Sequence, residues 1–261
     1  MKRIEKAFKG KKPLIIYATA CDPDFDTSLE FFRIILKYAD VVEVGMPFSD
    51  PLADGPTIQK AHERALKSGA NTEKVFELVS VLREEFPDKG IILMGYYNPV
   101  FVYGEEKFID DAAAAGADGF IIPDLPPEEG KNFSEYAKRK GLSPVFLAAP
   151  TSTDDRLKLI AEASSDFIYY VSLTGTTGAR DELDYPSIKA DIERVKKVTE
   201  KKVVVGFGIS KKKHIISLYG AVDGFVVGSA VVKKIEQLDK LGLEELLREL
   251  KNGIKEASNN T

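Results

Sequence analysis

The stretch KVVVGFGISKKKHIISLYGAVDGFVVG, from Lys202 to Gly228, contains two short apolar runs with a short helical pattern between them. Both runs are rich in valine and lack the alternation of apolar and polar residues that marks a strand with one solvated face. Continuous apolar runs are typical of parallel strands that are covered on both sides. The stretch therefore predicts a strand, a helix and a second parallel strand, which is the repeat of an α/β fold.

The same repeat extends over the whole chain of 261 residues. The apolar runs cover residues 14–20, 40–45, 91–97, 118–123, 143–149, 166–172, 202–208 and 223–228. Eight strand–helix repeats in roughly 250 residues match the size of one (β/α)₈ barrel, the TIM barrel. We predict a single α/β domain over 1–261, with an extra N-terminal helix in RIEKAFK and an extra helix at 56–67, after the second strand. An open, doubly wound sheet is the alternative, but it usually has fewer strands.

Composition excludes several classes of protein. Lys and Arg total 37 against 41 Asp and Glu, a net charge of −4, so no bulk field attracts nucleic acid or an anionic membrane. No apolar run approaches the roughly 20 residues that span a bilayer, and the charged N-terminus lacks the apolar core of an export signal. The single cysteine, Cys21, rules out a disulfide framework and fits a reducing compartment. We therefore expect a cytoplasmic protein.

The segment VEVGMPFSDPLADGP, from Val42 to Pro56, places Glu43 inside a predicted buried strand. Glutamate is depleted in strands and is almost never fully buried without a partner. Burial would raise its pKa toward neutrality, where a carboxyl group can both give and take a proton. Asp54 lies in the loop after this strand, at the functional end of such a barrel. Taken alone, Asp54 is better read as a turn former or a cap for the helix at Pro56.

Glycine follows three predicted strands in succession, in TGTTGAR (174–180), GFGIS (206–210) and VGSAVV (227–232). Glycine lets backbone amides approach an anion, and the start of a helix adds its positive end. Phosphate sites in these barrels commonly lie after strands seven and eight. These loops therefore favour a phosphate site, in which Ser229 would stand at a helix start.

Other chemistry has little support in the residues. His62 and His214 lie in helical patterns without a second ligand nearby, and we interpret both as surface or structural residues; no metal spacing is present. No lysine at a strand end suggests pyridoxal phosphate chemistry. Tyr17, Tyr96, Tyr169 and Phe207 lie in strand runs, where each suits the core but could line an apolar site at the barrel mouth.

The segment VEVGMPFSDPLADGPTIQKA resembles the hallmark segment of the tryptophan synthase alpha subunit family. MGYYNPVF, IIPDLPPEE, IYYVSLTGTTGAR, VGFGIS and VVGSAVV resemble further segments of that family in the same order, so the resemblance covers essentially the whole chain. It implies a lyase that cleaves indole-3-glycerol phosphate to indole and glyceraldehyde 3-phosphate without a cofactor.

The resemblance also implies roles for single residues. Glu43 would be the catalytic acid and base, and Asp54 would hold the indole N–H. Gly178, Gly208, Gly228 and Ser229 match phosphate-contacting positions of the family, and Tyr17, Tyr96, Tyr169 and Phe207 match positions that contact the rest of the substrate.

The family's alpha subunit pairs with a beta subunit that carries pyridoxal phosphate, in an alpha2beta2 heterotetramer. Asp50, Asn98 and Phe101 lie where the family's contact loops lie.

The residues leave two other functions open. Another phosphosugar barrel would be expected to use a lysine or cysteine at a strand end, and none is found. A non-catalytic regulatory partner would have no use for Glu43 and Asp54.

Overall fold

The computed structural model describes residues 2–171, 184–206 and 208–260. Its strands form one parallel sheet in the order β5-β4-β3-β2-β1-β9-β8-β7-β6. They are β1 (Leu14–Thr19), β2 (Val41–Gly45), β3 (Gly90–Met94), β4 (Gly119–Ile121), β5 (Ser143–Val145), β6 (Leu147–Ala148), β7 (Ile168–Val171), β8 (Val203–Gly206) and β9 (Gly224–Val227).

The fifth predicted strand closes this sheet into a barrel. β5 pairs with β4 and β6 pairs with β7, yet only Phe146 separates β5 from β6 along the chain. The two edge segments of the sheet are thus one interrupted strand, and the nine segments correspond to the eight predicted runs. The prediction of a TIM barrel is confirmed, and the open sheet is excluded because an open sheet would leave its two edges apart.

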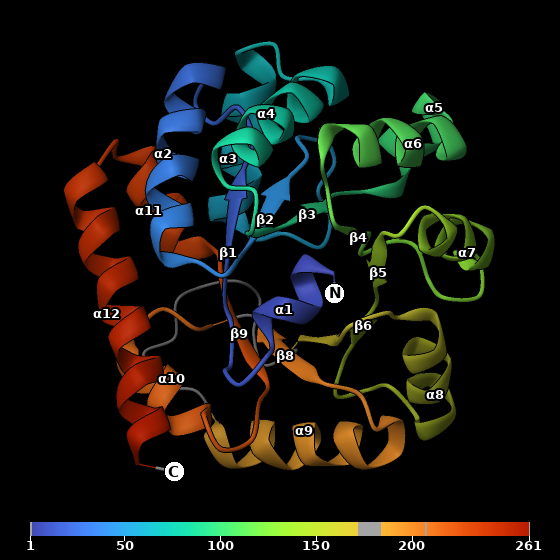
Figure 1. Ribbon diagram of the computed structural model, residues 1–261, viewed down its shortest axis with the longest axis vertical. Helices are drawn as coiled ribbons and strands as arrows, with labels where there is room; N and C mark the ends of the chain where they lie inside the picture. The colour runs from blue at the N-terminus through green and yellow to red at the C-terminus, as the bar shows by residue number, and fades with distance from the viewer. Residues whose placement is uncertain (1, 172–183, 207, 261) are drawn as a thin grey trace.

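Helices surround the ring of strands (Figure 1). They are α1 (Arg3–Ala7), α2 (Phe25–Tyr38), α3 (Pro56–Lys67), α4 (Thr72–Glu85), α5 (Tyr97–Tyr103), α6 (Glu105–Ala115), α7 (Lys131–Arg139), α8 (Asp154–Ala163), α9 (Tyr185–Thr199), α10 (Lys212–Leu218), α11 (Ser229–Glu236) and α12 (Lys240–Asn259). The extra helix after the second strand is α3, with the predicted bounds, and the N-terminal helix is α1.

Successive residues of each strand face opposite sides, which divides the core into two parts. Ile15, Val41 and Ile92 belong to a cluster inside the barrel, whereas their neighbours Ile16 and Val42 belong to the large cluster that packs against the outer helices. Both faces of the strands are therefore apolar, which explains why their sequences show continuous runs.

Helix α1 lies in front of the centre of the ring in Figure 1. Its Ile4 is fully buried, and Ile4 and Phe8 join the cluster inside the barrel. Phe8 contacts Phe167, with 5.5 Å between ring centres. This helix contacts β3 near Gly90, the first residue of that strand. It thus closes the end of the barrel where the strands begin.

One helix was not predicted. The run 91–97 was expected to be strand to its end, but β3 ends at Met94, and Tyr97 begins α5. Asp124, in the loop after β4, accepts a hydrogen bond from the backbone N–H of Tyr97 at 2.9 Å. A contact between residues 27 positions apart in sequence thus helps to hold the start of this short helix, and no local pattern indicates it.

Candidate active site

Glu43 projects into the barrel from the middle of β2. Its side chain is fully buried, and neither carboxyl oxygen has a hydrogen-bond partner among the described residues. Removal of the carboxylate from water raises the pKa of Glu43 to about 8. No lysine or arginine of the described part of the chain forms an ion pair with it. A buried, unpartnered acid is costly, so its presence points to proton transfer rather than to stability.

Two tyrosines lie inside the barrel near this acid. Tyr17 of β1 is the register partner of Glu43, and Tyr169 of β7 belongs to the interior cluster. Both are almost fully buried, and burial raises the pKa of each phenol well above its ordinary value. Each ring lies over a glycine of a neighbouring strand, where a Cβ atom would overlap the hydroxyl group: Tyr17 over Gly45 and Tyr169 over Gly206. The glycines therefore make room for the aromatic lining.

Asp54 does not cap the helix that follows it. The residue at the N-cap position of α3 is Gly55, and no side chain caps that helix. The Asp54 carboxylate instead accepts a hydrogen bond from the hydroxyl of Tyr96 at 2.8 Å. Tyr96 is itself held by the backbone N–H of Ala53, which donates to its oxygen at 3.0 Å. The capping interpretation is thus wrong, and tertiary contacts orient this carboxylate.

The residue that sequence reasoning missed is His62. The helical pattern led us to interpret it as a surface or structural residue, but its side chain is 2% exposed and its Nε2 lies 3.3 Å from Oδ2 of Asp54. The signal was present in the sequence, because His62 falls on the same face of α3 as Ala61 and Ala65, which are fully buried. The contact between His62 and Asp54 depends on how α3 packs, so the sequence alone does not show it.

The glycine loops are only partly described. Gly178 and Phe207 lie outside the described residues. Gly208 has a φ of +77°, a conformation that glycine adopts readily. The helix after this loop, α10, begins at Lys212, beyond the glycines.

Gly228 and Ser229 do stand at a helix start. Gly228 is the N-cap residue of α11, Ser229 is its first residue, and Ser229 is exposed. The first amides of a helix lack partners within it, so these residues present donors to an anion at the end of β9. Gly228 also lies beside Tyr17, since a Cβ atom added to it would be 3.5 Å from the Cβ of the tyrosine. The helix start therefore borders the aromatic lining.

The residues expected to contact a partner lie on two segments beside this site. Asp50 lies in the loop between β2 and α3, and Asn98 and Phe101 lie in α5; all three are exposed. Three apolar side chains project from the same segments, with exposed fractions of 91% for Leu52, 65% for Phe101 and 77% for Val102.

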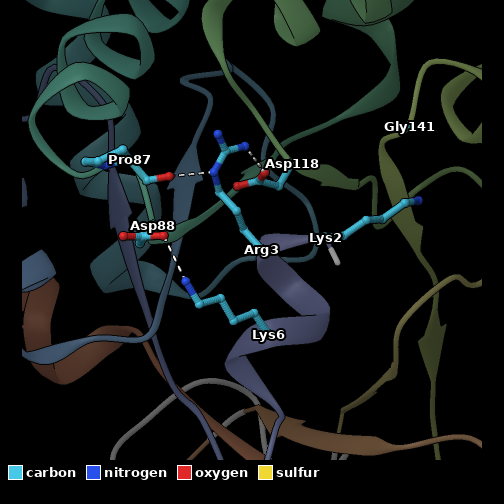
Figure 2. Close-up of a pocket in the computed structure, with 7 residues that line it drawn as sticks. All are labelled: Lys2, Arg3, Lys6, Pro87, Asp88, Asp118 and Gly141. Carbon is cyan, nitrogen blue, oxygen red and sulfur yellow. Dashed lines mark hydrogen bonds and ion pairs between the residues drawn. The ribbon is translucent and has the colours of Figure 1, made fainter.

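A pocket at the opposite end of the barrel holds no comparable chemistry. Figure 2 shows that Arg3 and Lys6 reach from α1 toward Asp118 and Asp88. The guanidinium of Arg3 is 3.0 Å from Asp118, and the ammonium of Lys6 is 2.9 Å from Asp88. These ion pairs tie α1 to the start of the strands, so we assign the pocket to the anchoring of this helix.

Comparison with known proteins agrees with this arrangement. The family model described as "Tryptophan synthase alpha chain" matches residues 4–260. The chain belongs to the tryptophan synthase alpha chain family. A relative of that name from Aquifex aeolicus is 51% identical over 249 residues, which cover 95% of each chain.

Solved structures of the alpha chain family have the same fold. The crystal structure of tryptophan synthase subunit alpha from Legionella pneumophila superposes with a TM-score of 0.91 at 35% identity, over 98% of this chain and 99% of that one. A chain of the tryptophan synthase a2b2 complex from Pyrococcus furiosus gives a TM-score of 0.86 at 43% identity, over 92% and 98%.

Membership of the alpha chain family gives this chain the alpha subunit role in tryptophan biosynthesis and a lyase activity. Within the described residues, no helix has both the length and the apolar character needed to cross a membrane. The same residues contain no cluster of three histidine, cysteine or acidic side chains that could hold a metal ion.

Proposed function

We propose that this chain cleaves indole-3-glycerol phosphate to indole and glyceraldehyde 3-phosphate by a retro-aldol reaction. The observation that carries the proposal is the fully buried and unpartnered Glu43, on the strand that leads into the loop of Asp54. The raised pKa of Glu43 lets its carboxyl group give and take a proton near neutral pH, which is what a general acid–base residue requires.

Glu43 moves the proton in both halves of the reaction. Its raised pKa keeps the carboxyl group protonated at neutral pH, so it donates its proton to ring carbon three of the indole. The resulting carboxylate takes the proton of the side-chain hydroxyl next to the bond that breaks. The electrons of that O–H bond form the aldehyde carbonyl, and those of the carbon–carbon bond return to the ring. Glu43 ends protonated, and no cofactor is required because the protonated ring accepts the electron pair.

Asp54 stabilises the charge that develops on the ring nitrogen. Protonation of carbon three places positive charge on that nitrogen, and an anion beside the N–H is stabilising in the transition state. Tyr17, Tyr96 and Tyr169 supply the surroundings of the substrate. The family resemblance adds Phe207, which lies outside the described residues. The hydroxyl of Tyr96 is engaged by Asp54, so this tyrosine helps to orient the carboxylate.

The phosphate of the substrate binds at the start of α11. The amides beside Gly228 and Ser229 supply donors, and the positive end of the helix adds a favourable field. The family resemblance adds Gly208 and Gly178 to this site, and Gly178 lies outside the described residues. Because Gly228 lies beside Tyr17, a phosphate held there places the indole toward the centre of the barrel.

The partner is a tryptophan synthase beta subunit, which would carry the pyridoxal phosphate. A relative from Pyrococcus furiosus forms an a2b2 complex. Here Leu52, Phe101 and Val102 present apolar surface beside the site, the kind of surface that marks a protein interface. The rings of Phe48 and Tyr96 also stack at 5.4 Å, so the two exposed segments are packed together around Asp54.

The deciding experiment follows indole after addition of indole-3-glycerol phosphate, with and without a beta subunit. We expect release by the wild-type chain, loss of release in Glu43→Gln, and loss of most turnover in Asp54→Asn. Isothermal titration with glycerol phosphate should give the same affinity in wild type and Glu43→Gln. Retained turnover in Glu43→Gln would reject the mechanism.

Partner binding is tested by sedimentation of the chain with a beta subunit. We expect Phe101→Ser to weaken the complex. Leu241→Ser is the matched control, because Leu241 is 77% exposed but belongs to α12. Equal weakening by both changes would contradict the assigned surface.

A further inference from the structure

His62 has a defined proton position. The backbone N–H of Phe48 donates to Nδ1 of His62 at 3.1 Å, so Nδ1 must carry a lone pair. A neutral imidazole has one donor and one acceptor nitrogen, and here the acceptor is assigned by the backbone. The ring proton is therefore on Nε2, on the side of the ring that faces the site.

That proton faces two oxygens. Nε2 lies 3.3 Å from Oδ2 of Asp54 and 3.5 Å from the hydroxyl of Tyr17. The Tyr17 hydroxyl can donate to Oγ1 of Thr19 at 3.2 Å, which leaves its lone pairs toward the histidine. Asp54 is the nearer acceptor and the charged one, and catalytic hydrogen bonds often shorten when the substrate binds.

Tyr96 and His62 use the same oxygen of Asp54. The Tyr96 hydroxyl donates to Oδ2 at 2.8 Å, and His62 approaches that same atom from α3. Both donors are uncharged, and no lysine or arginine in the described part of the chain pairs with this carboxylate. Oδ2 is thus held from two sides, while no side chain of the described residues contacts Oδ1, which is left for a donor on the substrate.

We propose that His62 is a positioning residue, whose Nε2–H fixes the Asp54 carboxylate so that Oδ1 receives the N–H of the indole ring. This inference rests on the proposed function. The contacts run from the backbone N–H of Phe48, through Nδ1 and Nε2 of His62, to the carboxylate of Asp54. Since a misplacement of about 1 Å can reduce a rate about a hundredfold, loss of this support should be visible in kcat.

The kinetic test compares His62→Leu, which removes the donor, with His62→Gln, whose amide can donate from a similar reach. We expect kcat for indole release to fall about 10- to 100-fold in His62→Leu and to recover to within about threefold of wild type in His62→Gln. Affinity for glycerol phosphate should stay unchanged in both variants. An unchanged kcat in His62→Leu, or a loss of glycerol phosphate binding equal to the loss of rate, would overturn the proposal.

A double-mutant cycle separates positioning from general loss of stability. In an Asp54→Asn background, His62→Leu should reduce the residual rate by less than about threefold, because residues that act through one another are not additive. Losses that multiply would show that His62 acts independently of Asp54, against the proposal.

Nitrogen-15 NMR of the histidines tests the geometry without any turnover. We expect the proton of His62 on Nε2, with Nδ1 bare, and a shift of the Nε2–H resonance on Asp54→Asn. His214 is the internal control, because its Nδ1 accepts from the backbone N–H of Ser210 at 3.2 Å, and its resonances should not move. A proton on Nδ1 of His62, or no shift on Asp54→Asn, overturns the inference. If the wild-type chain releases no indole, the proposed function fails, and this measurement decides the positioning by itself.

Discussion

Tyr17 and Glu43 are register partners on the adjacent strands β1 and β2, so both side chains project into the barrel at the same level. The phenol ring covers Gly45, at the end of β2, and contributes to the exclusion of water from the glutamate. Desolvation is the cause of the raised pKa of Glu43, and no other group contributes comparably. In the proposed mechanism, the aromatic lining therefore helps to keep the pKa of Glu43 high enough for proton transfer near neutral pH.

The rate of indole release should depend on pH through Glu43. In the proposed mechanism the reaction begins with the protonated form of Glu43, whose pKa is about 8. We expect kcat/KM to be nearly constant through neutrality and to fall about tenfold for each pH unit well above 8. The measurement is the initial rate of indole formation between pH 6 and 10. A rate that rises across this range would contradict the role of Glu43 as the initial donor.

The free energy of unfolding should also depend on pH through Glu43. Folding raises the pKa of Glu43 from its ordinary 4.5 to about 8. Between these pH values the folded state binds a proton that the unfolded state has lost. The free energy of unfolding therefore falls as the pH rises through this range. The full shift corresponds to roughly 5 kcal/mol above pH 8. Urea unfolding at several pH values should show that Glu43→Gln removes this decline. Asp50→Asn, which changes an exposed carboxylate, should leave it, and an unchanged decline in Glu43→Gln would show that the burial cost lies elsewhere.

Gly206 should be intolerant of even a methyl group. A Cβ atom there would overlap the hydroxyl of Tyr169, which cannot move freely because its ring is buried in the barrel. We expect Gly206→Ala to lower kcat/KM at least tenfold by displacing the ring from the site. The control is Gly220→Ala, since no atom lies within 4 Å of the added Cβ there. Equal activity of the two variants would argue against a role for Tyr169.

A negative charge at the start of α11 should weaken the binding of glycerol phosphate. Ser229→Asp places a carboxylate at the first position of the helix, where it favours the helix but repels a phosphate group. We expect affinity for glycerol phosphate to fall at least tenfold without a drop in melting temperature. Thr72→Asp makes the same change at the first position of α4 and should bind normally. Normal binding by Ser229→Asp would remove this helix from the phosphate site.

Helix α1, which closes the other end of the barrel, should affect stability and not catalysis. Ile4 of α1 is fully buried inside the barrel, so Ile4→Ala should cost about 2–5 kcal/mol of unfolding free energy. Well below the melting temperature, kcat should stay near that of wild type, because α1 lies where the strands begin. A selective loss of kcat with unchanged stability would show that α1 influences the active end.

The sequence by itself determined the barrel. Strands covered on both faces must be apolar throughout, so eight valine- and isoleucine-rich runs with helices between them indicate the fold without any long-range information. It also singled out Glu43, because an acid inside such a run is a local anomaly. The bounds of α3 followed from the spacing of the runs and from Pro56 at its start.

Only the tertiary structure decided how the site is assembled. It assigned Asp54 to Tyr96 and His62 and not to a helix cap, placed His62 inside the protein, and turned residues 97–103 into α5. These outcomes depend on contacts between segments that are far apart in sequence, such as Tyr96 with Asp54 and Asp124 with Tyr97. A local pattern reports which face of an element is apolar, but the partner of a polar group on that face is set by how the elements pack.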